Sequence, residues 1–196
     1  MTSRKKKGRI FVISAPSGTG KTTLLNRLLA DYPTMKRSVS CTTRSPRPGE
    51  HEGVDYHFVN EAEFRRLTEE GGFFEWEEVH GAFYGTPKGP LVQRHEAGLD
   101  TVLDIDTRGA RSVKKDFPDA CLIFLMPPSL DELEQRLRSR HTEEESSLRR
   151  RLENARREMG EKNRFDYVII NYDLDRAYGE LKSMVSGYRS GQGVRQ

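Results

Sequence analysis

The sequence contains little cysteine and no long apolar run. Its two cysteines, Cys41 and Cys121, lie far apart and lack the short spacings of metal ligands, which argues against a zinc site or a disulfide framework. No apolar run approaches the ~20 residues that span a bilayer, and the basic start of the chain is not followed by a signal-type apolar core. We therefore expect a protein of the reducing cytoplasm that does not enter a membrane.

The chain also lacks a dominant charge. Charged residues make up 32% of it, yet the formal net charge is only +3, and the basic residues are spread over several segments. Charge alone therefore does not favour nucleic-acid binding. The 196 residues suffice for one buried sheet but are few for two independent cores, so we expect one folding unit. The sequence does not reveal the oligomeric state.

Short β-rich runs alternate with segments of helical composition. These runs are RIFVIS (9–14), TVLDID (101–106), CLIFLM (121–126) and YVIINY (167–172). Strands that alternate with helices form parallel sheets, because each helix carries the chain back to the end of the sheet at which the previous strand began. We predict an α/β fold with a parallel sheet core and helices on both faces.

Two segments depart from this alternation. Residues 37–90 contain short aromatic runs around one helical stretch, 61–70, which predicts a small β-rich insertion. A charged helical region at 130–159 is interrupted at 139–147, which suggests the tip of a helical lid. The expected division is a core of 1–36, 91–136 and 148–196, an insertion of 37–90 and a lid of 137–147.

The first strand leads into APSGTGKT, from Ala15 to Thr22, which fits the phosphate-loop pattern except that Ala15 replaces the usual first glycine. Glycines at 18 and 20 let backbone N–H groups curl around a polyphosphate. Lys21 is then placed to reach the β and γ oxygens, and the Thr22 hydroxyl to bind magnesium. The flanking strand and leucine-rich helix favour this interpretation over an ordinary glycine-rich turn.

A second cluster, in SVSCTTRSPRPGEHEGVDYHF, suits a phosphate monoester. Arg44 and Arg47 stand three residues apart, with hydroxyls before them and Tyr56 after. Arginine pairs bidentately with phosphate oxygens, and hydroxyl groups complete the shell without adding charge. The arginines taken alone would be better explained by a solvated basic loop.

In order along the chain, the phosphate loop, SVSCTTRSPRPGE, DYHF, FFEWEEV, FYGTP and LDID resemble the motifs of the guanylate kinase family over nearly the whole sequence. This resemblance implies a P-loop NTPase-type core, a GMP-binding insertion and a lid. It implies transfer of the γ-phosphate of ATP, with Mg²⁺, to GMP and also to dGMP. The implied ATP contacts are Ala15, Pro16, Ser17, Gly18, Thr19, Gly20, Lys21, Thr22, Thr23, Arg136 and Asn171. The implied GMP-phosphate contacts are Ser40, Arg44, Arg47, Tyr56 and Tyr84.

The resemblance also places Glu75 and Thr86 at the guanine edge. A carboxylate can accept hydrogen bonds from both N1–H and the 2-amino group of guanine, whereas adenine offers neither donor. Leaving a buried charge unpaired costs at least ~1–3 kcal/mol, which would select against adenine. From the sequence alone, Glu75 could equally be a surface residue of an edge strand.

Asp104 and Asp106 close the run TVLDID, where carboxylates can hold magnesium through water or position the acceptor nucleotide. Two positions elsewhere in the chain depart from the family pattern. Arg108 stands where glutamine is usual, and Tyr172 stands where aspartate is common, beside Asn171, which matches a position near the adenine of ATP.

The charged helical region carries the arginines that the family uses for the chemical step. Arg136 and Arg140 are four residues apart and so share a helix face, and Arg151 follows the interruption. Phosphoryl transfer needs positioning and charge stabilisation, which we expect from Lys21, Arg47, Arg140 and Arg151. A solvated helix of i,i+4 ion pairs is the alternative for the arginines taken alone.

Three functions are compatible with these motifs: a guanylate kinase, a catalytically inactive phosphopeptide-binding module of related fold, and a kinase for another monophosphate. The intact Lys21, Thr22, Arg140 and Arg151 argue against the binding module. The acceptor cluster favours GMP. No nucleic-acid or membrane partner is expected.

Overall fold

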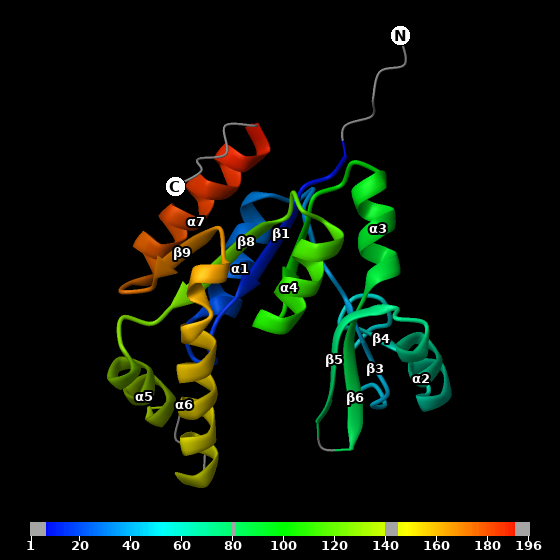
Figure 1. The fold of residues 1–196 in the computed structure, drawn as a ribbon, viewed down its shortest axis with the longest axis horizontal. Helices are drawn as coiled ribbons and strands as arrows, with labels where there is room; N and C mark the ends of the chain where they lie inside the picture. Colours follow the sequence, from blue (N-terminus) through cyan, green and yellow to red (C-terminus); the bar gives the residue numbers. More distant parts are fainter. Residues whose placement is uncertain (1–6, 80, 140–144, 191–196) are drawn as a thin grey trace. The chain divides into compact units, whose positions relative to one another are not determined.

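The computed structural model describes residues 7–79, 81–139 and 145–190 (Figure 1). The described residues form two compact units. Unit 1 contains Thr34–Ala120, and unit 2 contains Phe11–Pro33 and the described residues that follow Ala120. Within the described ranges, every helix is too short or too polar to span a bilayer.

Unit 2 is built on parallel strands in the order β1-β8-β9. Its elements are β1 (Ile10–Ser14), α1 (Lys21–Asp31), β8 (Cys121–Met126), α5 (Leu130–Arg138), α6 (Glu145–Gly160), the 3₁₀ helix η1 (Lys162–Arg164), β9 (Tyr167–Ile170) and α7 (Leu174–Ser190). All of β1 is buried, and so is β8 except for Met126. Such continuous apolar strands are typical of a parallel sheet covered on both faces. Helix α1 packs against α7 and buries Leu24, Leu25 and Leu28.

Helices α5 and α6 form a small core of their own, apart from the strands. It consists of Leu133, Leu137, Leu148 and Ala155, with Leu130 and Leu152 packed against it. These side chains recur at helical spacing, so each helix buries one stripe and exposes its charged face. The centre of the expected lid, residues 140–144, lies outside the described residues.

Unit 1 contains a parallel strand pair and a separate four-stranded sheet in the order β4-β3-β6-β5. Its elements are β2 (Lys36–Arg37), β3 (Ser40–Thr42), β4 (Tyr56–Phe58), α2 (Glu61–Glu69), β5 (Phe73–Val79), β6 (Ala82–Pro87), α3 (Lys88–Glu96), β7 (Thr101–Asp104) and α4 (Thr107–Asp116). Phe64 of α2 and Phe73 of β5 stack at 4.6 Å between ring centroids and enclose Cys41. The β-rich character expected of this segment is confirmed.

The α/β fold with a parallel sheet is also confirmed, and the strand boundaries differ only at their ends. The strand predicted at 121–126 is found unchanged, whereas that predicted at 101–106 stops at Asp104. It stops because the Asp106 side chain caps α4, accepting hydrogen bonds from the backbone N–H groups of Arg108 at 2.8 Å and Gly109 at 2.7 Å. The strand expected at 167–172 likewise ends at Ile170, before Asn171 leaves the sheet.

Candidate functional site

The loop between β1 and α1 has the geometry of an anion site. Gly18 and Gly20 have φ angles of 91° and 93°, a left-handed conformation that side chains other than glycine rarely adopt. Gly20 is the N-cap of α1 and has no side chain with which to cap the first turn. Backbone N–H groups at this end of a helix attract negative charge. Lys21 is half-buried here, and Thr22 and Thr23 are exposed.

Three side-chain contacts fix the loop within unit 2. The Thr19 hydroxyl donates to the Pro16 carbonyl at 2.7 Å. The side-chain amide of Asn171 donates to the Thr19 carbonyl at 2.7 Å, and Arg151 donates to the Ser17 hydroxyl oxygen at 2.6 Å. Residues distant in sequence therefore hold both halves of the loop.

Gly18 packs closely against α5. A Cβ atom at Gly18 would lie 2.7 Å from Leu137 Cδ2 and 3.1 Å from Leu133 Cδ1. The φ angle favours glycine here, and the close approach of these leucine side chains adds to that preference. Ala15, where the family pattern has glycine, is half-buried.

Two of the arginines expected to act in the lid, Arg136 and Arg151, contact other segments of unit 2. Arg136 donates to Glu132 at 3.0 Å and to the Asn171 carbonyl at 3.1 Å, while Arg151 donates to Ser17 in the loop between β1 and α1. Arg140 lies outside the described residues. The alternative of i,i+4 ion pairs holds in part for Arg136, because its partner Glu132 lies four residues earlier, and the neighbouring Arg138 makes a pair of the same kind with Glu134 at 2.7 Å.

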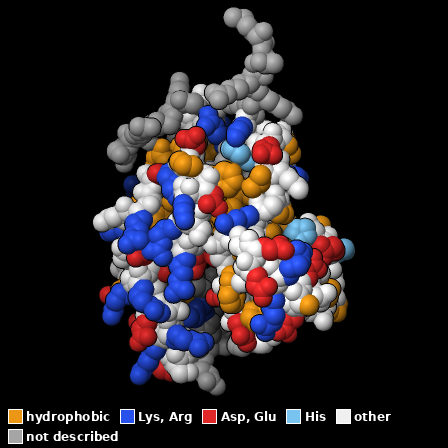
Figure 2. Space-filling view, turned by 45° about the vertical axis from the view of Figure 1, so that its right-hand side comes forward, with side chains coloured by type: hydrophobic (Ala, Val, Ile, Leu, Met, Phe, Trp, Pro, Cys, Tyr) orange, Lys and Arg blue, Asp and Glu red, His pale blue; other side chains and the backbone are white. Residues whose placement is uncertain are grey.

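Figure 2 shows many Lys and Arg side chains (blue) over the region of α6. Four arginines of this helix are exposed, namely Arg149, Arg150, Arg156 and Arg157. A surface so rich in positive charge raises the local concentration of polyanions.

In unit 1, Arg44 is surrounded by acceptors and aromatic rings. Its guanidinium pairs with both carboxylate oxygens of Glu50, at 2.8 and 3.0 Å, and its Nε donates to the Tyr84 hydroxyl oxygen at 3.3 Å. The guanidinium carbon lies 5.6 Å from the centroid of the Tyr56 ring, which is itself 5.9 Å from that of Tyr84. Three predicted phosphate contacts are thus neighbours.

Glu50 binds this loop together. It also accepts the backbone N–H of Arg47 at 2.7 Å. The Arg44 guanidinium, followed by the Arg47 N–H, lowers the pKa of the Glu50 carboxyl below its ordinary value. The side chain of Arg47 is exposed, and that of Ser40, at the start of β3, is half-buried.

Glu75 lies on β5, the edge strand of its sheet, but it is not a simple surface residue. Helix α4 packs against β5, and the Glu75 side chain is half-buried. Its carboxylate accepts hydrogen bonds from the Thr86 hydroxyl at 3.2 Å and from the Asp106 backbone N–H at 3.1 Å. The two residues expected at the guanine edge are therefore in contact with each other.

The position of Glu75 perturbs its ionisation. Burial raises the pKa of its carboxyl from 4.5 to about 8, and the nearby Asp106 carboxyl adds to the rise. The Asp106 N–H and the Thr86 hydroxyl act in the opposite direction by stabilising the carboxylate. Strongly shifted acids of this kind are concentrated at functional sites.

Asp104 ends β7 and accepts a hydrogen bond from Arg37 at 2.6 Å. The side chain of Asp104 is only 11% exposed, so this partner offsets much of the cost of burying its charge. Arg108 and Tyr172, which depart from the family pattern, are both exposed.

Sequence reasoning missed three residues of these clusters: Glu50, Gly109 and Arg37. The first acid after the two arginines of this loop was a usable signal for Glu50. Gly109 had none, because its role is one of close approach: a Cβ atom there would lie 2.5 Å from the nearer Glu75 carboxylate oxygen. Arg37 reads as an ordinary charged residue of a short exposed strand.

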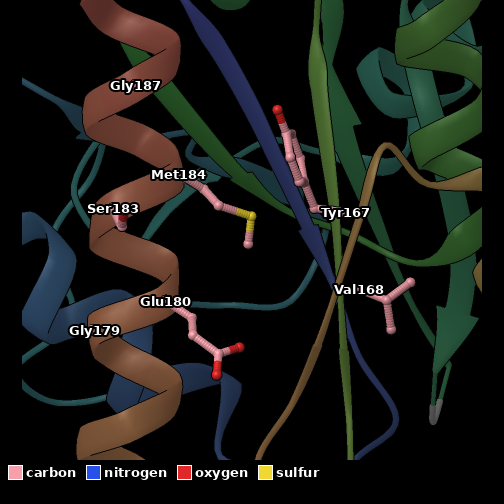
Figure 3. A pocket seen from close by; sticks show the side chains of 7 residues that line it. All are labelled: Tyr167, Val168, Gly179, Glu180, Ser183, Met184 and Gly187. Carbon is pink, nitrogen blue, oxygen red and sulfur yellow. The ribbon is translucent and has the colours of Figure 1, made fainter. Parts of the chain in front are cut away.

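A cavity of about 510 Å³ lies elsewhere in unit 2, between β9 and α7 (Figure 3). Met184 and Glu180 project into it from α7, and Tyr167 and Val168 line it from β9. None of the predicted site residues is among those that line it.

Comparison with known proteins gives a consistent result. The family model described as guanylate kinase matches residues 7–188. The chain is 51% identical to the guanylate kinase of Nitratidesulfovibrio vulgaris over 92% of this chain and 87% of the relative. It is 50% identical to that of Aromatoleum aromaticum over 93% and 89%. The crystal structure of guanylate kinase from Anaplasma phagocytophilum matches with a TM-score of 0.68 and 36% identity, over 96% of this chain and 88% of the other. The chain, with its P-loop fold and phosphate-binding loop, belongs to the guanylate kinase family.

Proposed function

We propose that the phosphate loop, the Arg44 cluster and the Glu75 pair bind ATP, Mg²⁺ and GMP for the reaction that this family catalyses. The chain is an ATP:GMP phosphotransferase and converts ATP and GMP to ADP and GDP. The single observation that carries the choice of guanine is the Glu75 carboxylate, half-buried and aligned by Thr86 and Asp106.

The donor phosphates bind to the loop from Ala15 to Gly20 and to the first turn of α1. The open N-terminus of α1 supplies backbone N–H groups, and Lys21 adds a cation that neutralises the β and γ oxygens. Thr23 and Arg136 contribute at the edge of this site, and Asn171 near the base.

Magnesium fits the donor set that the chain offers. Mg²⁺ keeps several waters and takes only one or two protein ligands beside substrate phosphates, so it needs no acidic cage. Among the described residues no three His, Cys, Asp or Glu side chains converge as a metal cage, and the exposed Thr22 hydroxyl stands beside Lys21. The ion would neutralise charge on the phosphates, and Thr22 would hold it.

The acceptor phosphate binds to the hydroxyls and guanidinium groups of the 40–56 loop and to Tyr84. These residues are Ser40, Arg44, Arg47, Tyr56 and Tyr84. Asp104 and Asp106 position the rest of the nucleotide. The contacts proposed for the phosphate and for guanine do not involve the 2′-hydroxyl of the sugar, so we extend the proposal to dGMP.

The chemical step needs cations and no general base. A phosphate monoester loses its second proton with a pKa of ~6, so the attacking oxygen is already ionised near neutral pH. Lys21, Arg47, Arg140 and Arg151 stabilise the charge that spreads over the transferred group. Of these, Arg151 donates a hydrogen bond to Ser17 of the phosphate loop.

Both cysteines are buried, and neither forms a disulfide. Thiols that are not oxidised to a disulfide are typical of a reducing compartment, and we propose a cytoplasmic location. Burial raises the pKa of the Cys41 thiol to about 11, which keeps it unreactive.

The acceptor is tested by measuring ADP release with GMP, dGMP, AMP, UMP and TMP at equal concentrations. We expect turnover with GMP and dGMP, and at least ~100-fold less with AMP, because adenine offers Glu75 neither the N1–H nor the 2-amino donor of guanine. Comparable kcat/KM values for GMP and AMP would refute the role of Glu75. Retained GMP turnover but no dGMP turnover would refute only the extension to dGMP.

A further inference from the structure

Asn171 connects three segments of unit 2 at the turn after β9. Its backbone N–H donates to the Met126 carbonyl at 2.8 Å, and its carbonyl accepts from Arg136 at 3.1 Å. Its side-chain amide donates to the Thr19 carbonyl at 2.7 Å. The residue is only 3% exposed, so these contacts are shielded from water.

From these contacts we propose that Asn171 is a positioning residue that keeps the Thr19–Gly20 peptide oriented for phosphate binding. The inference rests on the proposed binding of ATP phosphates by the loop. This role does not require the adenine contact that the family resemblance implies, and the experiment below separates the two.

The planarity of the peptide links the Asn171 contact to the phosphate site. In a trans peptide the C=O and the following N–H point in opposite directions. When the Thr19 carbonyl is held toward Asn171, the Gly20 N–H must point to the other side, away from Asn171. Gly20 is the N-cap of α1, so this N–H joins the donors of the first turn.

The loop needs such a restraint because glycines stand on both sides of Thr19. Gly18 and Gly20 have φ angles of 91° and 93°, and glycine populates positive and negative φ almost equally. The Thr19–Gly20 peptide could therefore flip at little local cost. A flip would direct the Thr19 carbonyl, an acceptor, at the phosphates in place of the Gly20 N–H.

Asn171 is itself firmly held. Its backbone N–H and its carbonyl both form hydrogen bonds. A Cβ atom at Gly20 would lie 2.9 Å from its side-chain amide nitrogen. Its side-chain oxygen is buried and has no hydrogen-bond partner among the described residues. Turning the amide over would place that oxygen against the Thr19 carbonyl, so the fold tolerates one unpaired acceptor to keep the donor on Thr19.

The test replaces Asn171 by leucine, which has a similar size but no donor, and by serine, which is small and polar. Asn163→Leu, at an exposed position of the same unit, is the matched control. Dissociation constants are measured by calorimetry for ATP and for purine riboside 5′-triphosphate, which lacks the 6-amino group, both with Mg²⁺. The same variants are titrated with GMP and their Tm values recorded.

We expect Asn171→Leu to raise the dissociation constants of both triphosphates by the same factor of about ten. The lost hydrogen bond acts through the loop and not through the base. The affinity of Asn171→Leu for GMP should be unchanged. Asn163→Leu should bind both triphosphates and GMP as the unmodified protein does. A loss confined to ATP would make Asn171 a reader of adenine and overturn the inference, as would unchanged affinity for both ligands.

A parallel loss of GMP affinity, or failure of both Asn171 variants to fold, would assign the residue to general stability and would also overturn it. If the unmodified protein bound neither triphosphate, the proposal that the loop binds ATP would itself be refuted. That result differs from each of those that refute only the role of Asn171.

Discussion

The ionisation of Glu75 predicts that the affinity for GMP depends on pH. Guanine presents two donors, N1–H and the 2-amino group, and only the carboxylate form of Glu75 accepts from both. Burial and the neighbouring Asp106 raise the pKa of Glu75 to about 8, so the free protein is largely protonated at this position near neutral pH. GMP binding must therefore release a proton, and affinity rises with pH.

The magnitude depends on the fraction of carboxylate. With a pKa of about 8, Glu75 is roughly 3% ionised at about pH 6.5 and roughly 75% ionised at about pH 8.5. The dissociation constant for GMP should fall about 25-fold across this window and level off above it. The second ionisation of the GMP phosphate, with a pKa of ~6, accounts for only a small part of this change.

The assay is calorimetric titration with GMP across this window, in buffers of different ionisation enthalpy so that the released proton is counted. Glu75→Gln removes the titrating group and should give a weaker, nearly pH-independent affinity. Glu77→Gln, at an exposed position of the same strand, should behave as the unmodified protein does. A flat affinity profile, or the same slope in Glu75→Gln, would refute the assigned role of this ionisation.

Stability should change with pH in the opposite direction. The pKa of Glu75 is higher in the folded protein than its ordinary value of 4.5, so the folded state binds the proton more tightly. Its contribution to stability is present in full below pH 4.5 and is lost as pH rises through about 8. The Tm of Glu75→Gln should therefore fall less than that of the unmodified protein between these limits.

Three further changes test other contacts. Gly109→Ala places a methyl group where the Glu75 carboxylate lies, so the affinity for GMP measured by calorimetry should fall about tenfold. The Tm should change little, because the Glu75 side chain can move aside. Unchanged affinity would contradict the alignment of Glu75. Glu50→Gln removes the charged partner of Arg44, and we expect GMP to bind about three- to tenfold more weakly; tighter binding would instead make Glu50 a competitor of the phosphate. Lys21→Ala should lower kcat by about a thousandfold or more while the Kd for GMP stays unchanged, because the lysine serves the donor; an equal loss of GMP affinity would oppose that assignment.

Much of the fold was predictable because its signals are local. The apolar run at 121–126 forms β8 within the predicted limits, and the glycine-rich loop lies between a buried strand and a leucine-rich helix as expected. Hydrophobic period and turn residues decide such elements without reference to distant parts of the chain.

The contacts of the site were less predictable because they join residues far apart in sequence. The Gly109–Glu75 approach and the bond from Asn171 to Thr19 depend on how helices and strands pack, which no local pattern encodes. The fold class could thus be inferred from spacing, whereas the pairing of Glu75 with Thr86 was expected only by resemblance. The raised pKa of Glu75 required the burial that α4 gives to β5.

The pairing of Arg44 with Glu50 and Tyr84 has a consequence for the energetics of substrate capture. Long side chains lose up to about 2 kcal/mol of rotational freedom when they are immobilised. In this protein that loss occurs during folding, because the guanidinium is already restrained by its two neighbours. An incoming monophosphate then meets a stationary cation, so its association should show a smaller entropic penalty than a flexible arginine would impose.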